Sequence, residues 1–348
     1  MQALVLAGGE GTRLRPLTYT TPKPVMPLAG RPFLSFMLDW LNGHGVDEVI
    51  LSCGFMSDDV RQVLGDIYNG MRLRYVVEEE PLGTAGPVRL AFDQGVLDER
   101  LLVLNGDVLS DMDLTAELEV HERTGARVTL ALHPVEDTES YGVVPLAGDG
   151  QVEAFLEKTE APATNLVNAG AYVVERDVVD GLIPGGRAVS FEREVFPALV
   201  GKGLYGFEAA GYWVDIGTPE RYLEATWDLL AGRVASELPP RDETGSLVYE
   251  NCLLSGAHIG PQSVLGRHCS VGTDARVERS VLHERVHVGA DAAIIEAVLA
   301  ERVRVGERAR VEPGAIVGAG AVIGQDAVIG AGARIDPGMT VQAAERVS

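Results

Sequence analysis

The densest group of chemistry-bearing residues lies in the first 24 positions of the chain. An apolar run at residues 2–6 leads into a glycine-rich turn, Gly8-Gly9-Glu10-Gly11-Thr12-Arg13. Glycines in such a turn let backbone N–H groups approach phosphate oxygens closely. Arg13 can bind a phosphate through two parallel hydrogen bonds, and Lys23 lies between two prolines that stiffen the backbone around its ammonium group. These features predict a triphosphate-binding site.

The whole pattern of residues is stronger evidence for a phosphate site than the glycines alone, because many Gly-Gly pairs only form tight turns. The pattern Gly-Gly-x-Gly-Thr-Arg-Leu, followed by Pro22-Lys23-Pro24, differs from both the dinucleotide-binding fingerprint and the P-loop. The chain uses arginine for nearly all of its 29 basic residues, and its only lysines are Lys23, Lys158 and Lys202. A lysine inside this motif therefore indicates a need for a compact ammonium group.

Residues 1–232 alternate between strand-like and helix-like segments. The predicted strands are residues 2–6, 48–52, 73–77, 101–104, 128–132 and 170–174. The predicted helices are residues 33–43, 58–64, 84–92 and 219–232. Ser57 or Asp58 is the expected N-cap of the second helix. The alternation predicts an α/β fold, in which a Rossmann-like, mostly parallel sheet carries helices on both faces.

A polar, proline-bearing segment at residues 233–245 is typical of a linker, and the pattern changes after it. Aliphatic residues then recur every six positions, and the count slips by one residue before Val288 and again before Val305. The recurring positions are Ile259, Leu265, Val271, Val277, Val288, Ile294, Val305, Val311, Val317, Ile323, Ile329 and Ile335. This period predicts a left-handed parallel β-helix over residues 246–348. Because the ends of a β-helix expose backbone, we also expect a homo-oligomer.

Composition narrows the range of partners. The formal net charge is −22, so the surface repels nucleic acid and anionic membranes, and a phosphate ligand must be held by a local site. No apolar run approaches the roughly 20 residues of a membrane span, and no signal peptide is visible. Cys53, Cys252 and Cys269 form no C-x-x-C pair, which favours buried thiols in a reducing, cytoplasmic setting.

Further motifs follow the opening segment in a fixed order, at residues 78–87, 105–108, 141–144, 155–158, 168–170, 190–197 and 213–219. Together these segments resemble the nucleotide-sugar pyrophosphorylases, and most closely those that act as mannose-1-phosphate guanylyltransferases. The resemblance covers nearly the whole chain, including the hexapeptide tail. It implies an enzyme that joins a sugar 1-phosphate to a nucleoside triphosphate and releases pyrophosphate, through in-line attack on the α-phosphorus.

The resemblance also implies roles for single residues. As catalytic groups, Arg13 would bind the β,γ-phosphates, Lys23 would bridge phosphate oxygens at the reacting centre, and Lys158 would hold the sugar phosphate. Asp107 and Asp215 would bind Mg²⁺, a hard cation suited to carboxylate and phosphate oxygens. Contacts to the nucleotide would come from Leu6, Ala7, Gly8, Gly9, Gly11, Thr12, Arg13, Glu78, Glu80, Pro81, Gly83 and Thr84. Contacts to the sugar phosphate would come from Asn105, Gly106, Gly142, Glu157, Lys158, Asn168 and Gly170.

Several of these residues have an alternative, purely structural interpretation. Each aspartate could be a helix cap or a solvated carboxylate. Asp107 follows an apolar strand at the carboxyl edge of the sheet, where ligand sites lie, and this favours the metal role. Arg15 is either a second phosphate ligand or a surface charge. Tyr141 and Trp213 are expected to pack rather than to bind a ligand.

The loop at residues 78–83 lies where the family reads the base. Guanine offers N1–H and N2–H₂ donors, which suit a carboxylate or a carbonyl acceptor. Three consecutive glutamates at positions 78–80 therefore favour GTP over another nucleoside triphosphate. Mannose 1-phosphate is the expected second substrate. Glucose 1-phosphate, whose sugar differs from mannose in one hydroxyl, and a sugar-like cyclitol phosphate are alternative substrates.

Three other functions compete with this interpretation. A glucose-1-phosphate thymidylyl-, uridylyl- or adenylyltransferase would share the same motifs. An inactive regulatory or scaffold homologue would be favoured by loss of Arg13, Lys23 or the aspartates, all of which are present. A bifunctional enzyme with an acyltransferase β-helix would need a base such as His258, His268, His283 or His287. The short tail favours a structural or oligomerising role instead.

Overall fold

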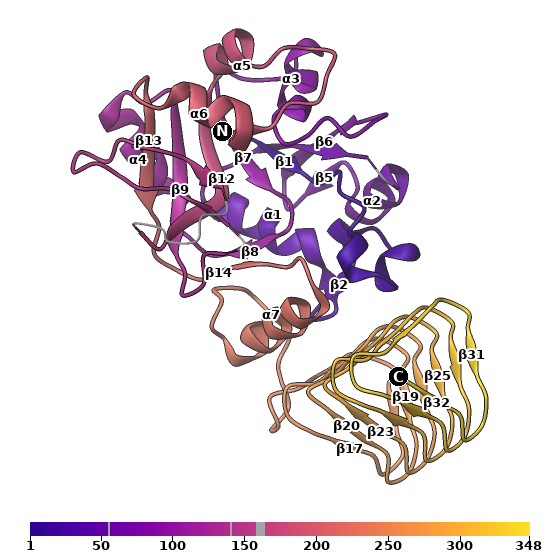
Figure 1. Cartoon of the computed structure of the whole chain (residues 1–348). Coiled ribbons are helices and arrows are strands. Elements are labelled where there is room, and N and C mark those ends of the chain that lie inside the picture. Colours follow the sequence, from indigo (N-terminus) through magenta and orange to yellow (C-terminus); the bar gives the residue numbers. More distant parts are fainter. Residues whose placement is uncertain (55, 140, 158–163) are drawn as a thin grey trace. The chain divides into compact units, whose positions relative to one another are not determined.

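The computed structural model describes residues 1–54, 56–139, 141–157 and 164–348, and these form two compact units (Figure 1). The first unit comprises residues 1–9 and 37–213, and the second comprises residues 10–36 and 214–348. The units interleave along the chain, because the segment after the first strand belongs with the C-terminal residues. The domain boundaries expected from the sequence, 1–232, 233–245 and 246–348, stay a prediction.

The first unit is built on a mixed sheet with a parallel centre. Four parallel strands lie side by side in the order β7 (Arg100–Asn105), β1 (Gln2–Leu6), β4 (Glu48–Cys53) and β6 (Met71–Val77). Leu6 at the end of β1 pairs with Ser52 on one side and with Asn105 on the other. The strands therefore end together at one edge, and the expected α/β class is confirmed.

Antiparallel strands extend this sheet. β12 (Leu166–Glu175) runs antiparallel to β7 and to β9 (Val128–Pro134), and β9 pairs in parallel with β13 (Leu204–Glu208). The register of β12 against β9 shifts between Asn168 and Tyr172, which is a β-bulge. The short strands of this unit are β5 (Ile67–Tyr68), β8 (Val108–Ser110), β10 (Gly142–Val143) and β11 (Leu156–Glu157), and β14 (Trp213–Asp215) begins at its last residue.

Helices follow the strands of this unit. They are α1 (Phe33–Gly43), α2 (Ser57–Leu64), α3 (Gly86–Asp93), α4 (Leu114–Thr124), α5 (Arg176–Leu182) and α6 (Phe196–Leu199), with a π-helical turn η4 (Phe191–Val195) before the last. In the described ranges, no helix combines the length and the apolar character needed to cross a bilayer. The unit's core contains large buried side chains, among them Tyr172, Phe191 and Phe196.

Two helix starts differ from the sequence-based expectation. α2 begins at Ser57, and its N-cap is Met56 in a left-handed conformation with no side-chain cap, so the expected cap at Ser57 or Asp58 was wrong. α3 begins at Gly86 rather than at Thr84. The Thr84 hydroxyl is bound to a distant segment, as described below, and the backbone becomes helical only after it.

The second unit joins residues 10–36 to α7 (Pro219–Ala231) and to the β-helix. Thr218 caps α7 by accepting from the Arg221 N–H, and Gly232 ends it in a left-handed conformation. Residues 10–36 form three short 3₁₀ helices and one hairpin before α1. These are η1 (Thr12–Leu14), η2 (Leu17–Tyr19), η3 (Lys23–Val25), β2 (Pro27–Leu28) and β3 (Arg31–Pro32).

Three parallel six-stranded sheets form the β-helix, which confirms the expected architecture (Figure 1). The first sheet contains β15 (Leu247–Val248), β18 (Val264–Leu265), β21 (Val281–Leu282), β24 (Val298–Leu299), β27 (Ile316–Val317) and β30 (Arg334–Ile335). The second contains β16 (Leu253–Leu254), β19 (Ser270–Val271), β22 (His287–Val288), β25 (Arg304–Val305), β28 (Val322–Ile323) and β31 (Thr340–Val341). The third contains β17 (His258–Ile259), β20 (Arg276–Glu278), β23 (Ala293–Ile295), β26 (Arg310–Val311), β29 (Val328–Ile329) and β32 (Arg346–Val347).

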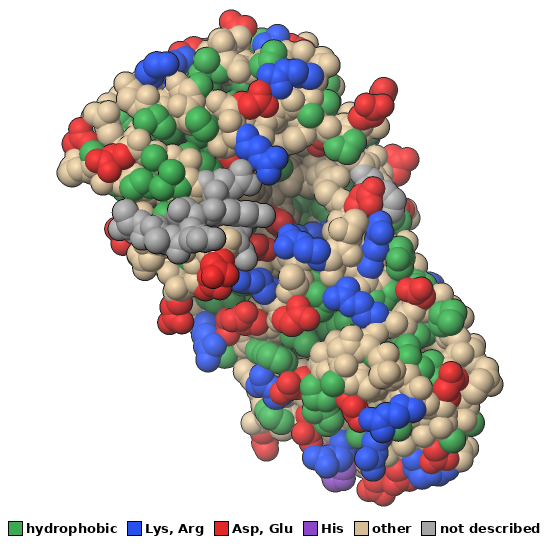
Figure 2. Space-filling model, viewed as in Figure 1, with side chains coloured by type: hydrophobic (Ala, Val, Ile, Leu, Met, Phe, Trp, Pro, Cys, Tyr) green, Lys and Arg blue, Asp and Glu red, His purple; other side chains and the backbone are tan. Residues whose placement is uncertain are grey.

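The interior of the β-helix is a stack of the aliphatic residues that recur in the sequence. Leu265 pairs with Leu282, and Leu282 pairs with Leu299, because the turns before Leu282 and before Leu299 are each one residue shorter. These two turns account for the slips in the six-residue period. Outside, acidic and basic side chains are interspersed (Figure 2), as in the pair between Arg308 and Asp326 at 2.8 Å.

A buried carboxyl group makes the stability of the first unit sensitive to pH. Glu117 on α4 is fully buried, no cation pairs with it in the described part of the chain, and burial raises its pKa well above the ordinary value. The folded state therefore keeps a proton that the unfolded chain loses above about pH 4.3. Stability from this group is lost as the pH rises towards the folded-state pKa.

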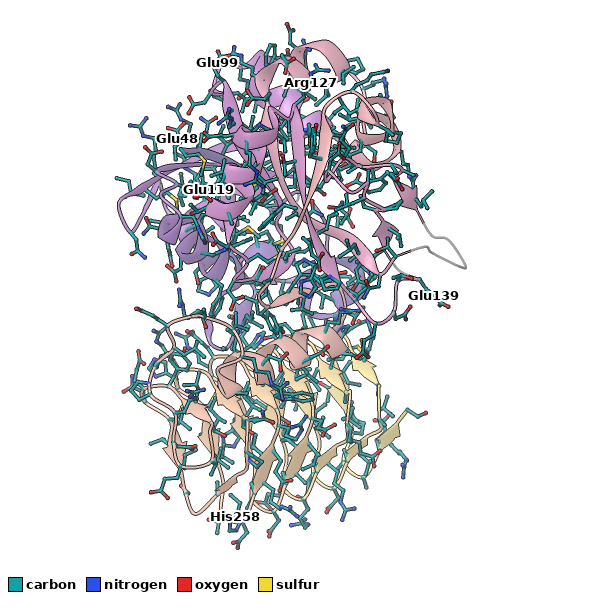
Figure 3. The ribbon with its side chains drawn as sticks, turned by 90° about the vertical axis from the view of Figure 1, so that its left-hand side faces the viewer. Glu48, Glu99, Glu119, Arg127, Glu139 and His258 are labelled. Carbon is teal, nitrogen blue, oxygen red and sulfur yellow. The ribbon has the colours of Figure 1, made fainter. Side chains whose placement is uncertain are left out.

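We expect Glu117→Gln to raise the melting temperature at pH 8 by roughly 2–4 °C, the shift that about 1 kcal/mol produces in a domain of this size. The gain should shrink towards pH 5, and thermal melts across this range measure it. Glu119→Gln is the matched control, because Glu119 is exposed on the same helix (Figure 3). Equal melting curves for wild type and Glu117→Gln at pH 8 would contradict the expectation.

Candidate active site

The carboxyl ends of the parallel strands in the first unit are joined by backbone hydrogen bonds. The Ala7 N–H donates to the Ser52 carbonyl at 2.8 Å, and the Gly106 N–H donates to the Leu6 carbonyl at 2.9 Å. The Glu78 N–H donates to the Cys53 carbonyl at 2.8 Å. The residues predicted for nucleotide binding at positions 6–9 and 78, for sugar binding at positions 105 and 106, and for metal binding at Asp107 therefore lie along one sheet edge.

Two glycines at this edge are required by close packing. A Cβ at Gly106 would lie 2.6 Å from the Leu6 carbonyl oxygen, and a Cβ at Gly8 would lie 2.7 Å from Glu78 Oε1. Neither space accepts a side chain without displacement. Gly9 differs, because a Cβ there would meet nothing within 4 Å. The Gly9 backbone is consequently open on one side, as a phosphate contact requires, whereas the corresponding space at Gly8 is occupied by the Glu78 carboxylate.

Glu78 holds the loop that follows β6. Its Oε1 accepts from the Ser52 hydroxyl at 2.8 Å, and its Oε2 accepts from the Leu82 N–H at 3.2 Å. The carboxylate thus ties the loop to the neighbouring strand β4. Glu79 and Glu80 are exposed, as are Pro81 and Gly83. Of the three glutamates expected to favour guanine, Glu78 is the one with a defined orientation.

The second half of this loop is bound to residues 189–192. The Thr84 hydroxyl donates to Glu192 Oε2 at 2.6 Å and accepts from the Phe191 N–H at 2.8 Å. Gly83 has a φ of +76°, and a Cβ there would lie 2.5 Å from the Val189 carbonyl oxygen. The loop conformation therefore depends on a segment more than 100 residues later in the chain.

The predicted sugar contacts meet around the bulge in β12. Asn168 Nδ2 donates to the Tyr172 hydroxyl at 2.9 Å, and Asn168 Oδ1 accepts from the Gly170 N–H at 3.1 Å. Gly170 has a φ of +74°, and a Cβ there would lie 2.7 Å from Asn105 Nδ2. The bulge thus brings Asn168 and Gly170 next to Asn105, which comes from the adjacent strand β7.

Tyr172 is the buried centre of this group. Burial raises its pKa well above the ordinary value, and the negative charges of Glu192 and Asp107 raise it further. The phenol therefore stays protonated at neutral pH and orients Asn168 as a neutral partner. Asn105 Oδ1 is a buried oxygen with no hydrogen-bond partner among the described residues. It leaves an acceptor open to a hydroxyl group.

The remaining residues expected near the sugar differ in how far the structure describes them. A Cβ at Gly142 would lie 2.8 Å from the Phe155 ring, so only glycine fits there. Trp213 packs against Tyr141 with ring centroids 5.3 Å apart, in line with the expected packing role. The backbone of Glu157 belongs to β11, and Lys158 lies outside the described residues.

In the second unit, the side chains of Arg13 and Asp215 both approach Gly217. A Cβ at Gly217 would lie 2.7 Å from Arg13 Nη2 and also 2.7 Å from Asp215 Oδ1. A guanidinium and a carboxylate therefore converge on a space that only a glycine leaves open. Arg13 projects from η1, and Gly11 before it adopts a φ of +62° with its carbonyl accepting from the Thr18 hydroxyl at 2.8 Å.

Lys23 is only 9% exposed and begins η3, which leads into the β2–β3 hairpin. Two tyrosines hold this hairpin. Tyr249 of the first β-helix coil donates to the Ala29 carbonyl at 2.8 Å, and Tyr222 of α7 donates to the Pro27 carbonyl. Because the Tyr222 hydroxyl proton is used, His283 Nε2, 3.1 Å away, must donate to its oxygen.

Burial lowers the pKa of His283 to about 4, so this imidazole is neutral at physiological pH. It is thus a structural group rather than the free base that an acyltransferase needs. His258 instead projects from the β-helix surface (Figure 3). Arg15 pairs with Glu10 at 2.9 Å and lies over the Tyr19 ring, which favours a surface charge over a second phosphate ligand.

Two protein-family models match the sequence of this chain. A family model described as nucleotidyl transferase covers residues 2–232, and a model described as the GMPPB C-terminal domain covers residues 250–320. The chain belongs to the nucleotidyl transferase family. It is therefore a nucleotidyltransferase enzyme, as expected from the motifs.

Named relatives share most of the length of this nucleotidyltransferase. A mannose-1-phosphate guanylyltransferase of Mycobacterium tuberculosis is 42% identical over 80% of this chain and 78% of its own. Mannose-1-phosphate guanylyltransferase 1 of Arabidopsis thaliana is 33% identical over 91% of both chains. The solved structure of HddC from Yersinia pseudotuberculosis is 28% identical, with a TM-score of 0.54, and covers 64% of this chain and 97% of its own.

Sequence reasoning missed several residues that support the nucleotidyltransferase site. Ser52 and Glu192 orient Glu78 and Thr84, while Tyr222 and Tyr249 hold the hairpin after Lys23. Glu192 lies within residues 190–197, one of the motifs that carried the family resemblance, so the sequence could have indicated it as a site residue. The other three occupy ordinary strand, helix and coil positions, and only the folded chain shows their partners.

The Gly83 backbone provides a test of the loop. Gly83→Ala should raise the KM for the nucleotide at least tenfold, because the new Cβ would collide with the Val189 carbonyl and displace the loop. Gly95→Ala is the matched control, since Gly95 has a similar φ of +69° but a Cβ there would meet nothing within 4 Å. Both variants carry the backbone strain of about 1–2 kcal/mol. Steady-state kinetics measure the KM of both variants. Equal KM values would contradict a role of this loop in nucleotide binding.

Proposed function

We propose that this protein transfers a guanylyl group from GTP to α-D-mannose 1-phosphate, giving GDP-mannose and pyrophosphate. The observation that carries the proposal is the 33–42% identity, over most of the chain, to relatives that are named mannose-1-phosphate guanylyltransferases. The sheet edge described above supports it, because the open Gly9 backbone, the loop after β6 and the Asn105–Asn168 group offer surfaces for phosphate, base and sugar.

The reaction needs positive charge where two anions meet. An oxygen of the sugar phosphate attacks the α-phosphorus, and the bond from that phosphorus to the pyrophosphate oxygen breaks in line with it. Arg13 would bind the β,γ-phosphates and stabilise the leaving pyrophosphate, and Lys23 would bridge oxygens at the reacting centre. Lys158 would hold the sugar phosphate. The protein forms no covalent bond and acts by positioning and charge neutralisation.

Asp107 and Asp215 are the proposed Mg²⁺ ligands. Carboxylate oxygens are the donors that this cation takes together with substrate phosphates and water. Each carboxylate suits this role by its chemistry and by its place in its own unit, since Asp107 follows directly after the strand that ends at Asn105 and Asp215 Oδ1 lies 2.7 Å from where a Cβ of Gly217 would stand. When bound, Mg²⁺ would neutralise charge on the phosphates during the in-line displacement.

The base preference rests on the loop after β6. The Glu78 carboxylate is already oriented by Ser52 and by the Leu82 N–H, and each of its oxygens keeps a lone pair for another donor. Guanine offers such donors on its Watson–Crick edge, whereas thymine presents a mixed edge. This supports GTP over dTTP or UTP. Transfer to glucose 1-phosphate or to another sugar-like phosphate is the competing enzyme function.

A panel of substrates tests the proposal. Purified protein should release pyrophosphate fastest from GTP with mannose 1-phosphate, by at least tenfold over UTP, dTTP or ATP, and over glucose 1-phosphate. Coupled pyrophosphate detection measures each pair, and the sugar nucleotide is identified by mass spectrometry. Faster turnover of dTTP or UTP would reject the guanylyl assignment. The lack of turnover with every pair would favour an inactive scaffold homologue.

Removal of single carboxylates tests the metal assignment. Asp107→Asn and Asp215→Asn should each lower kcat by a factor of about 10² or more, because each removes a ligand from a cation that stabilises the transition state by several kcal/mol. Asp180→Asn, at an exposed position on α5, is the control. Chelation with EDTA should abolish turnover and added Mg²⁺ should restore it. Full activity of both variants in Mg²⁺ would refute the assignment.

A further inference from the structure

The first sheet of the β-helix has outward-facing side chains that are nevertheless buried. The outward residues of this sheet are apolar and at most 1% exposed. They are Leu247, Val264, Val281, Val298 and Ile316, and we call them the apolar stripe. On the third sheet the equivalent positions include Arg276 and Arg310, which are exposed. The first sheet is therefore the face against which other parts of the second unit pack.

The contacts across this face come from α7 and from the hairpin after Lys23. The Trp227 indole N–H donates to the Arg279 carbonyl at 3.1 Å, and the Arg279 guanidinium lies 3.8 Å from the centre of the Trp227 ring. Tyr249 and Tyr222 reach the hairpin as described above. Within this unit, residues 10–36 thus pack against the β-helix and α7.

The stripe ends in an arginine. Arg334 occupies the sixth outward position, directly after Ile316 in the register of the sheet. Its Nη1 donates to the Arg15 carbonyl at 2.7 Å and to the Arg13 carbonyl at 3.1 Å. A single guanidinium nitrogen therefore holds the backbone on both sides of Leu14, and one of the two residues is Arg13 itself.

These carbonyls are the ones that the local helix leaves open. Within η1, the Leu14 N–H donates to the Gly11 carbonyl and the Arg15 N–H donates to the Thr12 carbonyl. The carbonyls of the last residues of a short helix have no partner inside it and need an outside donor. Arg334 supplies this donor from a coil more than 300 residues away.

We infer that Arg334 is a positioning residue, which fixes η1 so that the Arg13 side chain is held ready for the triphosphate. The inference rests on the proposed function, in which Arg13 binds the β,γ-phosphates. Among the described residues, the hydrogen bonds of the Arg334 side chain go to the backbone carbonyls of Arg13 and Arg15. Because the hydrogen bonds are exposed, they contribute little to overall stability. Their effect should appear in nucleotide affinity, since ordering of the loop before binding lowers its entropic cost.

Kinetics give the first test, with whichever nucleoside triphosphate the wild type uses best. Arg334→Ala should raise the KM for the nucleotide about tenfold, leave kcat within about threefold and shift the melting temperature by less than about 2 °C. Arg334→Lys should restore most of the affinity, because an ammonium group also donates to carbonyls. Arg310→Ala, an outward arginine of another sheet, is the matched control and should match wild type. A KM for Arg334→Ala within twofold of wild type would overturn the inference.

Hydrogen exchange of the peptide over residues 10–19 gives a second test that needs no turnover. In Arg334→Ala the Leu14 and Arg15 amides should exchange at least tenfold faster than in wild type or Arg310→Ala. Unchanged exchange would overturn the inference even in an active enzyme. If the wild type turns over no sugar phosphate but Arg334→Ala still accelerates exchange, the proposed function fails while the positioning role stands.

Discussion

The parallel pairing of β1 with β4 on one side and with β7 on the other is the constraint on which the first unit depends. It sets Leu6 opposite both Ser52 and Asn105, so three strands end at the same level. A slip of one residue in either register would turn every side chain of the strand to the opposite face. The Gly8 backbone, the Glu78 carboxylate packed against it and the Asn105 amide converge because this register holds.

In the second unit, a short segment with little regular secondary structure is held in one conformation by the elements packed against it. Residues 10–32, before α1, contain only 3₁₀ turns and one hairpin, and such elements have few internal hydrogen bonds. Their stability comes from α7 and from the apolar stripe of the β-helix, whose stacked coils present a rigid face. Tyr222, Tyr249 and Arg334 each donate to a backbone carbonyl of this segment.

The proposed anion binding has to work against an acidic chain. The net charge is −22, yet Glu78 and Glu192, two carboxylates of the first unit, are engaged as hydrogen-bond acceptors. Glu78 accepts from a serine hydroxyl and an amide, and Glu192 accepts from the Thr84 hydroxyl. In the proposed reaction, Arg13 and Lys23 would supply the positive charge, and hydrogen bonds from neighbouring elements of the second unit hold the backbone of their segment. The global field therefore matters less than the local arrangement of donors.

The sequence by itself determined the elements whose signals are local. The bounds of β1 and α1, the six-residue period with its two shortened turns, and the motif around Arg13 could all be predicted, because neighbouring residues set backbone periodicity. Only the tertiary structure decided the partners of Thr84 and Arg334. Those bonds join residues 107 to 321 positions apart, and strand order and coil stacking bring them together. Arg334 did break the apolar pattern of its face, but nothing local indicated which backbone it would bind.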